Sequence, residues 1–148
     1  MTYAQWYHDF GDRHRTIVTT LDHLNDDEVI EYFAYDNMRQ QHPDFCPLYA
    51  TGKKCHDLND LNCYLCGCPH FRYCDMGLSE EMGGTRYSRC AIASRFEQTF
   101  THKGSIHTNC SACPLPHTTG FIREHFDRNW GEIMAGCEEC PPHLQKSS

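Results

Sequence analysis

The sequence contains no long apolar run. None of its apolar stretches approaches the roughly 18 residues that a membrane-spanning helix needs. The first ten residues, MTYAQWYHDF, lack the basic and apolar parts of a secretory signal. We therefore expect a soluble protein of the cytoplasm that has no membrane partner.

Positive charge is also scarce. Lys and Arg number 13 against 20 Asp and Glu, which leaves a net charge of -7. Such a chain has no general attraction for nucleic-acid phosphates or anionic lipids, so nucleic acid is disfavoured as a partner. The same acidity suits docking on the basic surface of another protein.

Common enzyme motifs are missing as well. The chain has neither the C-x3-C-x2-C trio of radical enzymes nor a glycine-rich phosphate loop, and Gly83-Gly84 is an isolated turn signal. Cys55 stands next to His56, but a thiol nucleophile needs a base that is close in space, which adjacency in the sequence does not establish. We therefore predict no catalytic residue, and a cluster-dependent or thiol-dependent enzyme is only an alternative.

Cysteine and histidine, by contrast, are abundant, with 11 of each among 148 residues. A reducing cytoplasm argues against a disulfide framework, and so does the odd number of cysteines. Bound metal is then the leading explanation for the thiols.

The distribution of cysteine divides the chain into three parts. Residues 1–43 contain none and are predicted to form a helical region, residues 44–120 form a cysteine-rich metal-binding domain, and residues 121–148 combine a helix with a Cys-Pro tail. Apolar periodicity disappears over most of the middle part, where metal crosslinks would replace regular structure. The expected fold is small and metal-stabilised, mainly α and irregular, with N-terminal helices and a C-terminal helix around a core of cysteine-rich loops.

Helices are expected at both ends of the chain. Apolar residues at helical spacing predict two short helices near the N-terminus, the first of which ends at Gly11. Asn25, followed three residues later by Glu, is a capping-box signal for another helix, which Pro43 stops. One helix over residues 121–134, with Gly136 as its stop, is expected at the other end.

The strongest motif is a set of three C-x2-C pairs. Two residues between ligands let a tight turn direct both sulfurs at one metal or cluster. The pairs are Cys63 with Cys66, Cys110 with Cys113, and Cys137 with Cys140. Metal ligation is therefore predicted.

Two details favour iron–sulfur clusters over zinc. Cys63, Cys66 and Cys68 form C-x2-C-x-C, and three such close thiolates suit a multi-iron cluster, or two adjacent sites, better than one zinc ion. Cys-Pro occurs four times, and proline fixes the backbone after a ligand. Zinc stays open, because His56 and His117 would complete tetrahedral sites of Cys and His.

Four cysteine-containing segments carry a resemblance to a known family. They are CPLY from Cys46, CH from Cys55, NCYLCGCP from Asn62, and NCSAC from Asn109 with a following Pro-His. Over about residues 44 to 120 they resemble the cysteine-rich small domain family of prokaryotic metal-binding domains, whose pattern is C-x-x-[FY], P-C-H, N-C-x-x-C-x-C-P, a lone Cys and D-C-x-x-C-x-x-P-H. Lys54 and Asn109 replace a Pro and an Asp of that pattern, and neither change affects a ligand.

The resemblance implies eight cysteine ligands in two sites, with His56 and His117 as further ligands or as hydrogen-bond donors to the ligands. The eight are Cys46, Cys55, Cys63, Cys66, Cys68, Cys90, Cys110 and Cys113. As a working division, Cys63, Cys66, Cys110 and Cys113 share one site and the other four share the second. The pattern says nothing about Cys74, Cys137 and Cys140.

Together these features predict a protein that carries two 4Fe–4S clusters and acts in electron transfer or redox sensing with a protein redox partner. The first alternative is a zinc-stabilised interaction module with two zinc ions and no redox activity. The second is the enzyme considered above. No feature of the sequence predicts an oligomeric state.

Overall fold

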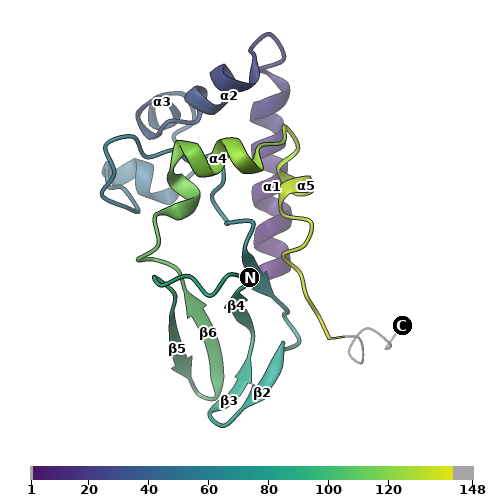
Figure 1. Ribbon diagram of the computed structural model, residues 1–148. Helices are drawn as coiled ribbons and strands as arrows, with labels where there is room; N and C mark the ends of the chain where they lie inside the picture. Colours follow the sequence, from purple (N-terminus) through teal and green to yellow (C-terminus); the bar gives the residue numbers. More distant parts are fainter. Residues whose placement is uncertain (1, 142–148) are drawn as a thin grey trace.

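The structure is a computed structural model that describes residues 2–141, so the end of the predicted Cys-Pro tail, residues 142–148, lies outside the described residues. Helices gather at one end of the molecule and strands at the other (Figure 1). The helical elements are α1 (Tyr3–Thr19), α2 (Asp26–Tyr32), α3 (Tyr35–Gln41), the 3-10 helices η1 (Pro47–Thr51) and η2 (Leu115–His117), α4 (Thr119–His125) and α5 (Trp130–Ile133). The strands are β1 (Phe71–Tyr73), β2 (Ser79–Glu81), β3 (Gly84–Arg86), β4 (Ser88–Cys90), β5 (Gln98–His102) and β6 (Ser105–Asn109).

The prediction of a mainly α and irregular fold is wrong, because residues 71–109 form two sheets in a mixed α/β fold. Strands β1 and β4 pair antiparallel as a two-stranded sheet. The other sheet has the order β2-β3-β6-β5, in which β3 and β6 run parallel and the other pairs antiparallel. Part of the middle region that was expected to be irregular therefore consists of paired strands.

The strands carry little of the alternation that identifies a half-buried sheet. They are three to five residues long, and all residues of β2 and β5 are exposed. Only β6 alternates, with Ile106 and Thr108 buried. Since period-two hydrophobicity is the main sequence signal for a strand, these strands give almost none.

The N-terminal region forms one long helix instead of two. Helix α1 continues through Gly11, where an added Cβ would lie 3.2 Å from the Trp130 ring. Glycine at position 11 therefore leaves room for the Trp130 indole and does not end the helix. The expected capping box at Asn25 is confirmed, since its side chain accepts from the Glu28 N–H and the Glu28 carboxylate accepts from the Asn25 N–H.

Two other predicted helices are each broken in two. The segment after Asn25 forms α2 and α3, separated at Ala34, which pairs with Asn62 in an isolated antiparallel bridge. The segment over residues 121–134 forms α4 and α5, with extended backbone at Phe126 between them. Within the described residues, no helix has the length and apolar character required to cross a membrane.

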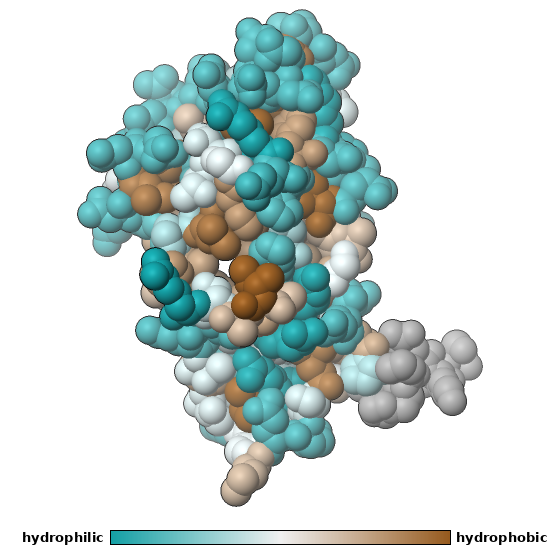
Figure 2. Space-filling view, in the orientation of Figure 1, coloured by the Kyte–Doolittle hydropathy of each residue, from teal (hydrophilic) through white to brown (hydrophobic). Residues whose placement is uncertain are grey.

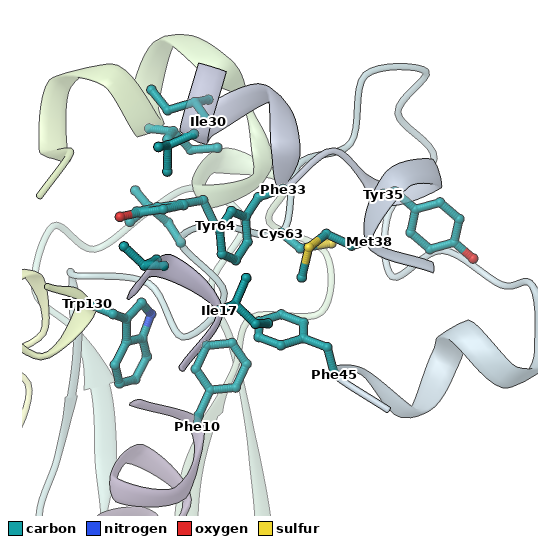
Figure 3. Packing of buried hydrophobic residues seen from close by; sticks show 14 of the residues in the cluster. Phe10, Ile17, Ile30, Phe33, Tyr35, Met38, Phe45, Cys63, Tyr64 and Trp130 are labelled. Carbon is teal, nitrogen blue, oxygen red and sulfur yellow. The ribbon is translucent and has the colours of Figure 1, made fainter. Parts of the chain in front are cut away.

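An aromatic core joins α1 to the segments around it (Figure 3). Phe10 packs on Trp130 with ring centroids 4.9 Å apart, and the fully buried His14 stacks on Phe33 at 4.7 Å. His14 Nε2 lies 3.1 Å from the Tyr64 carbonyl, which only accepts, so this nitrogen donates. Burial lowers the pKa of His14 to about 4, and the ring is therefore neutral at ordinary pH.

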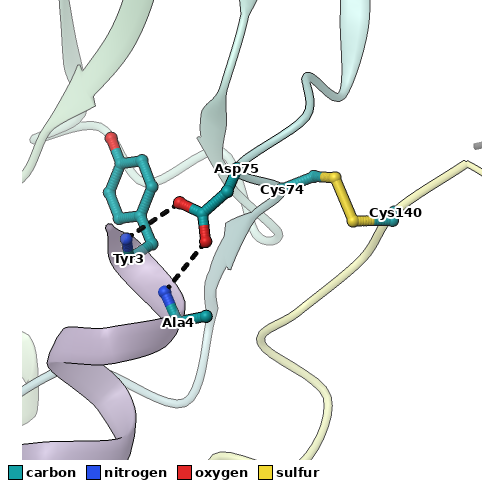
Figure 4. The surroundings of a disulfide bond; sticks show 5 residues. All are labelled: Tyr3, Ala4, Cys74, Asp75 and Cys140. Atoms are coloured by element: carbon teal, nitrogen blue, oxygen red, sulfur yellow. Dashed lines mark hydrogen bonds between the residues drawn. A yellow bond between two sulfur atoms is a disulfide. The ribbon is translucent and has the colours of Figure 1, made fainter. Parts of the chain in front are cut away.

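The chain beyond α5 returns to the strand end and is fixed there by a disulfide between Cys74 and Cys140 (Figure 4). This bond corrects the expectation that metal alone accounts for the thiols. The next residue, Asp75, accepts from the Tyr3 and Ala4 backbone N–H groups at 2.8 and 3.1 Å. The start of α1 is thereby held beside β1, since a carboxylate satisfies N–H groups that the helix leaves unpaired.

Candidate metal centres

The loop of residues 62–68 carries three predicted ligands through the middle of the molecule. The Asn62 side chain donates to a carbonyl of α2 at 2.7 Å, and the Cys63 N–H donates to the carbonyl that follows α2 at 2.9 Å. The Trp130 indole donates to the Cys66 carbonyl at 3.2 Å. The loop has no regular structure, yet its backbone is anchored to the aromatic core.

Gly67 and Cys68 turn this loop sharply. Their φ angles of 108° and 55° lie in the left-handed region, which glycine adopts freely and other residues rarely. Gly67 also lacks room for a side chain, because a Cβ would lie 3.0 Å from the Trp130 ring. As a result, the thiols of Cys66 and Cys68 interact with different sets of cysteines although one residue separates them.

The first thiol group consists of Cys46, Cys55, Cys63 and Cys66. Burial raises the pKa of the Cys63 thiol to about 12, and the charges of neighbouring thiols add to the effect. Burial likewise raises the pKa of Cys66, followed by the effects of the other three thiols. Because every pair in the group interacts in this way, the four sulfurs lie near one another.

Tyr49 completes the surroundings of the first thiol group. Tyr49 lies in η1, which begins directly after Cys46, and it is 2 % exposed. Its hydroxyl is near enough to lower the pKa of the Cys63 thiol, but it makes no hydrogen bond among the described residues. A metal-bound Cys63 thiolate would accept a hydrogen bond from this hydroxyl, so the site suits a thiolate ligand.

The second thiol group consists of Cys68, Cys90, Cys110 and Cys113. Cys90 ends β4, and Cys110 and Cys113 follow β6 in a tight turn in which the Cys113 N–H donates to the Cys110 carbonyl at 2.9 Å. Burial raises the pKa of Cys68 to about 12 and that of Cys110 to about 11, and the other thiols of the group add to both shifts. This group lies where the strands meet the loop of residues 62–68.

A cavity of about 850 Å³ opens beside the second thiol group, and all four of its cysteines line it. Aromatic side chains of Trp6, Tyr7 and Phe71 form part of the wall. Apolar side chains also gather in the middle of the face shown in Figure 2, between the helical end and the strand end. The cavity has more space than a four-cysteine centre alone would fill.

The sulfurs of the two thiol groups form no compact triplet. Among residues 2–141, no three sulfurs of either thiol group lie within 4.8 Å of one another. A tetrahedral zinc ion with Zn–S bonds of about 2.3 Å holds its sulfurs about 3.8 Å apart. In a four-iron cluster each thiolate binds a different iron, so the thiolates stand further apart. Neither group therefore has three sulfurs at the spacing of a single tetrahedral ion among the described residues.

His56 and His117, the two predicted auxiliary residues, lie beside the first thiol group. Their ring centroids are 4.9 Å apart, and His117 Nε2 is 3.6 Å from the Cys55 sulfur. His117 is buried and His56 is half-buried. The two histidines therefore meet Cys55 in space, as their assignment as ligands or neighbouring donors requires.

The working division of the ligands is wrong. The pair Cys63 and Cys66 shares its group with Cys46 and Cys55, whereas the pair Cys110 and Cys113 shares its group with Cys68 and Cys90. Each group thus contains one C-x2-C pair and two single cysteines. The left-handed turn at Gly67 and Cys68 places the thiols of Cys66 and Cys68 in different groups, although one residue separates them in the sequence.

The remaining cysteines belong to neither thiol group. Cys74 and Cys140 form the disulfide, and Cys137 is a buried free thiol whose sulfur lies 3.6 Å from the Cys68 carbonyl. Two functional residues were missed from the sequence: Tyr49, and Asn62 as the residue that holds His117. Both residues belong to the cysteine-containing segments CPLY and NCYLCGCP, but their contacts form only in the folded chain.

Comparison with family models, curated proteins and solved structures finds no match to this chain. The resemblance to the cysteine-rich small domain family therefore stays a prediction. What the two thiol groups can do follows from their own donors, which are eight sulfurs with two nearby histidines.

Proposed function

We propose that this chain is an iron–sulfur protein that carries two 4Fe–4S clusters and acts in electron transfer or redox sensing. The observation that carries the proposal is the arrangement of eight thiols in two groups of four, which is the number of thiolates that a four-iron cluster takes. The first thiol group would hold one cluster and the second thiol group the other. Such clusters exchange electrons at potentials that the surrounding protein adjusts.

The protonation of the thiols favours ligation over nucleophilic chemistry. A catalytic cysteine needs a lowered pKa, because the thiolate is the nucleophile. Burial instead raises the pKa of Cys63 to about 12 and that of Cys110 to about 11. Metal binding displaces these protons, and the positive metal compensates the negative charge of each buried thiolate.

The proximity of the two groups supports electron exchange between them. Cys66 and Cys68 belong to different groups and are joined through Gly67 alone. Two residues so placed have Cα atoms at most about 7 Å apart, because consecutive Cα atoms are 3.8 Å apart. Two clusters on these ligands would be immediate neighbours.

A protein redox partner is part of this proposal. The net charge of -7 favours docking on a basic surface. Cys55 is the exposed member of the first thiol group, and the second thiol group borders the cavity. Both centres therefore have a route toward the surface along which a partner could exchange electrons.

The proposal is tested by the metal content and visible spectrum of protein purified without oxygen. We expect about eight irons and eight sulfides per chain, and a brown colour that bleaches with dithionite. A colourless protein with about two zinc ions would overturn the proposal and leave the zinc-stabilised interaction module in its place.

Single substitutions test the ligand assignment. We expect Cys66→Ala and Cys110→Ala each to lower the iron content by about half, because each removes a ligand from one cluster. Cys137→Ala is the control, since Cys137 is also a free cysteine, is buried, and belongs to neither thiol group. Full iron content in both ligand variants would contradict the assignment.

A further inference from the structure

Cys55, His56 and His117 form a more compact group than either set of thiols. Their ligand atoms all lie within 4.8 Å of one another, which holds for no other group of three Cys, His, Asp or Glu residues between residues 2 and 141. The Cys55 sulfur and His117 Nε2 are 3.6 Å apart. A tetrahedral zinc ion with Zn–S of about 2.3 Å and Zn–N of about 2.0–2.1 Å would separate these two atoms by about 3.6 Å.

The orientation of His117 is the one that a metal-ligating histidine adopts. Its Nδ1 lies 2.9 Å from the Asn62 backbone carbonyl. A carbonyl only accepts, so Nδ1 carries the hydrogen and the neutral ring keeps its lone pair on Nε2, which faces Cys55. Ligating histidines are held in this way by a hydrogen bond from the other ring nitrogen.

The position of His117 is set by the core of the protein. The Asn62 side chain donates to a carbonyl of α2 at 2.7 Å, and the Asn62 N–H donates to the His117 carbonyl at 3.1 Å. His117 is itself only 7 % exposed. The ring is therefore fixed before any ligand arrives, which lowers the entropic cost of binding.

Two of the three residues border the cavity beside the second thiol group. His56 and His117 line it together with Trp6, Tyr7 and Phe71. Among the described residues that line the cavity there is no Lys or Arg. Apart from a bound metal ion, an anionic molecule would find no cation there but would meet Asp75 and Glu97, whereas an uncharged molecule with an apolar or aromatic body would find suitable walls.

We propose that Cys55, His56 and His117 bind a third metal, a single zinc ion, whose fourth coordination position opens into the cavity. Three protein ligands and one open position are the arrangement in which zinc binds a water or polarises an oxygen atom of a ligand. The ligand class is a small uncharged molecule with an oxygen donor and an apolar body. The inference rests on the proposed function at one point: Cys55 also belongs to the first thiol group, so its thiolate bridges the ion and the first cluster when both are bound.

Cobalt is the probe for this site, because tetrahedral Co²⁺ is coloured and can replace zinc. The full chain with its iron–sulfur clusters intact is freed of zinc by dialysis and titrated with Co²⁺. We expect one equivalent to bind, with a thiolate-to-cobalt band in the difference spectrum. Zinc added afterwards should displace the cobalt and remove the band.

Two variants locate the ion. Loss of a residue that only orients a ligand lowers metal affinity about 10–100-fold, so His56→Gln and His117→Gln should lower it by at least about 100-fold. Both histidines lie beside Cys55 of the first thiol group, so iron and sulfide are measured in each variant together with cobalt binding. His23→Gln is the matched control, since His23 is exposed and outside the group. If His117→Gln does not fold, the half-buried His56 still provides the test.

The outcomes separate this inference from the proposed function. Full iron content without cobalt binding overturns the third metal site, and the contact between Cys55 and His117 is then a hydrogen bond only. Cobalt binding that both histidine variants retain also overturns it. A protein without iron overturns the proposed function, but loss of cobalt binding in the histidine variants would still establish the third site.

Discussion

The two thiol groups differ in their surroundings. The first thiol group lies against the helical end, with Tyr49 packed on Cys63 and the Cys66 carbonyl held by Trp130. The second thiol group lies at the strand end, where its four cysteines line an open cavity. One group is therefore supported by a dense aromatic core, and the other by short strands with few buried residues.

This difference assigns distinct contributions to the two parts of the molecule. In the helical part, apolar burial stabilises the fold whether or not metal is bound. In the strand part, all residues of β2 and β5 are exposed. Hydrogen bonds between strands, together with the disulfide and metal ligation, must therefore stabilise this part. We expect metal removal to disturb the second thiol group more than the first.

The largest effect is expected from Trp130→Ala. The indole is 2 % exposed, packs on Phe10 and donates to the Cys66 carbonyl, so its removal should lower the free energy of unfolding by about 3–5 kcal/mol. Chemical denaturation measures this change. Phe100→Ala on β5 is the control, because Phe100 is 50 % exposed and its loss should stay within about 0.5 kcal/mol. Equal losses in both variants would remove the distinction between the two parts.

A smaller effect is expected from acid acting on the helical part. His14 has a pKa of about 4 in the folded protein and an ordinary value of 6.5 when unfolded, so the unfolded chain binds the proton first. The stabilising contribution is complete above pH 6.5 and is lost as the pH falls toward 4. By pH 5 the free energy of unfolding should drop by about 2 kcal/mol.

Denaturation curves at pH 7 and pH 5 test this dependence. His14→Gln should flatten it, whereas His102→Gln should leave it unchanged, because His102 is exposed on β5. A pH dependence that persists in His14→Gln would show that another group is responsible.

The smallest effect is expected from Tyr49→Phe. Loss of the hydroxyl removes one hydrogen bond to a Cys63 thiolate, which is worth about 1 kcal/mol. Donors to the sulfurs stabilise the reduced cluster, so the reduction potential of the first cluster should fall while that of the second stays constant. Redox titration measures both potentials.

The control for Tyr49→Phe is Tyr35→Phe. The Tyr35 hydroxyl donates to the Lys53 carbonyl at 2.7 Å and not to a thiol. Tyr35→Phe should therefore lose stability of the same order without moving either potential. Identical potentials in all three proteins would show that Tyr49 has no contact with a ligand.

Sequence reasoning succeeded where the determinants are local. The capping box at Asn25 depends on residues three positions apart, and it forms as expected. The adjacency of Cys55 and His56 likewise guarantees that the two lie together. Their contact with His117, 61 positions after His56, was not predicted, because it depends on the folded chain.

Sequence reasoning failed where a distant segment decides the local structure. Gly11 resembles a helix stop, but the Trp130 ring occupies the space that a side chain would fill. The division of the thiols depends on a left-handed turn at Cys68, which a non-glycine residue seldom adopts and which no local signal predicts. The strands were missed because their residues are mostly exposed and do not alternate.

The disulfide between Cys74 and Cys140 closes a covalent ring of the chain. Three members of the second thiol group, Cys90, Cys110 and Cys113, lie on this ring, whereas all members of the first lie outside it. When the chain unfolds with the bond intact, the ring limits how far those three thiols can separate. Assembly of the second centre therefore costs less chain entropy than it would without the disulfide, and reduction of one sulfur–sulfur bond would remove that advantage.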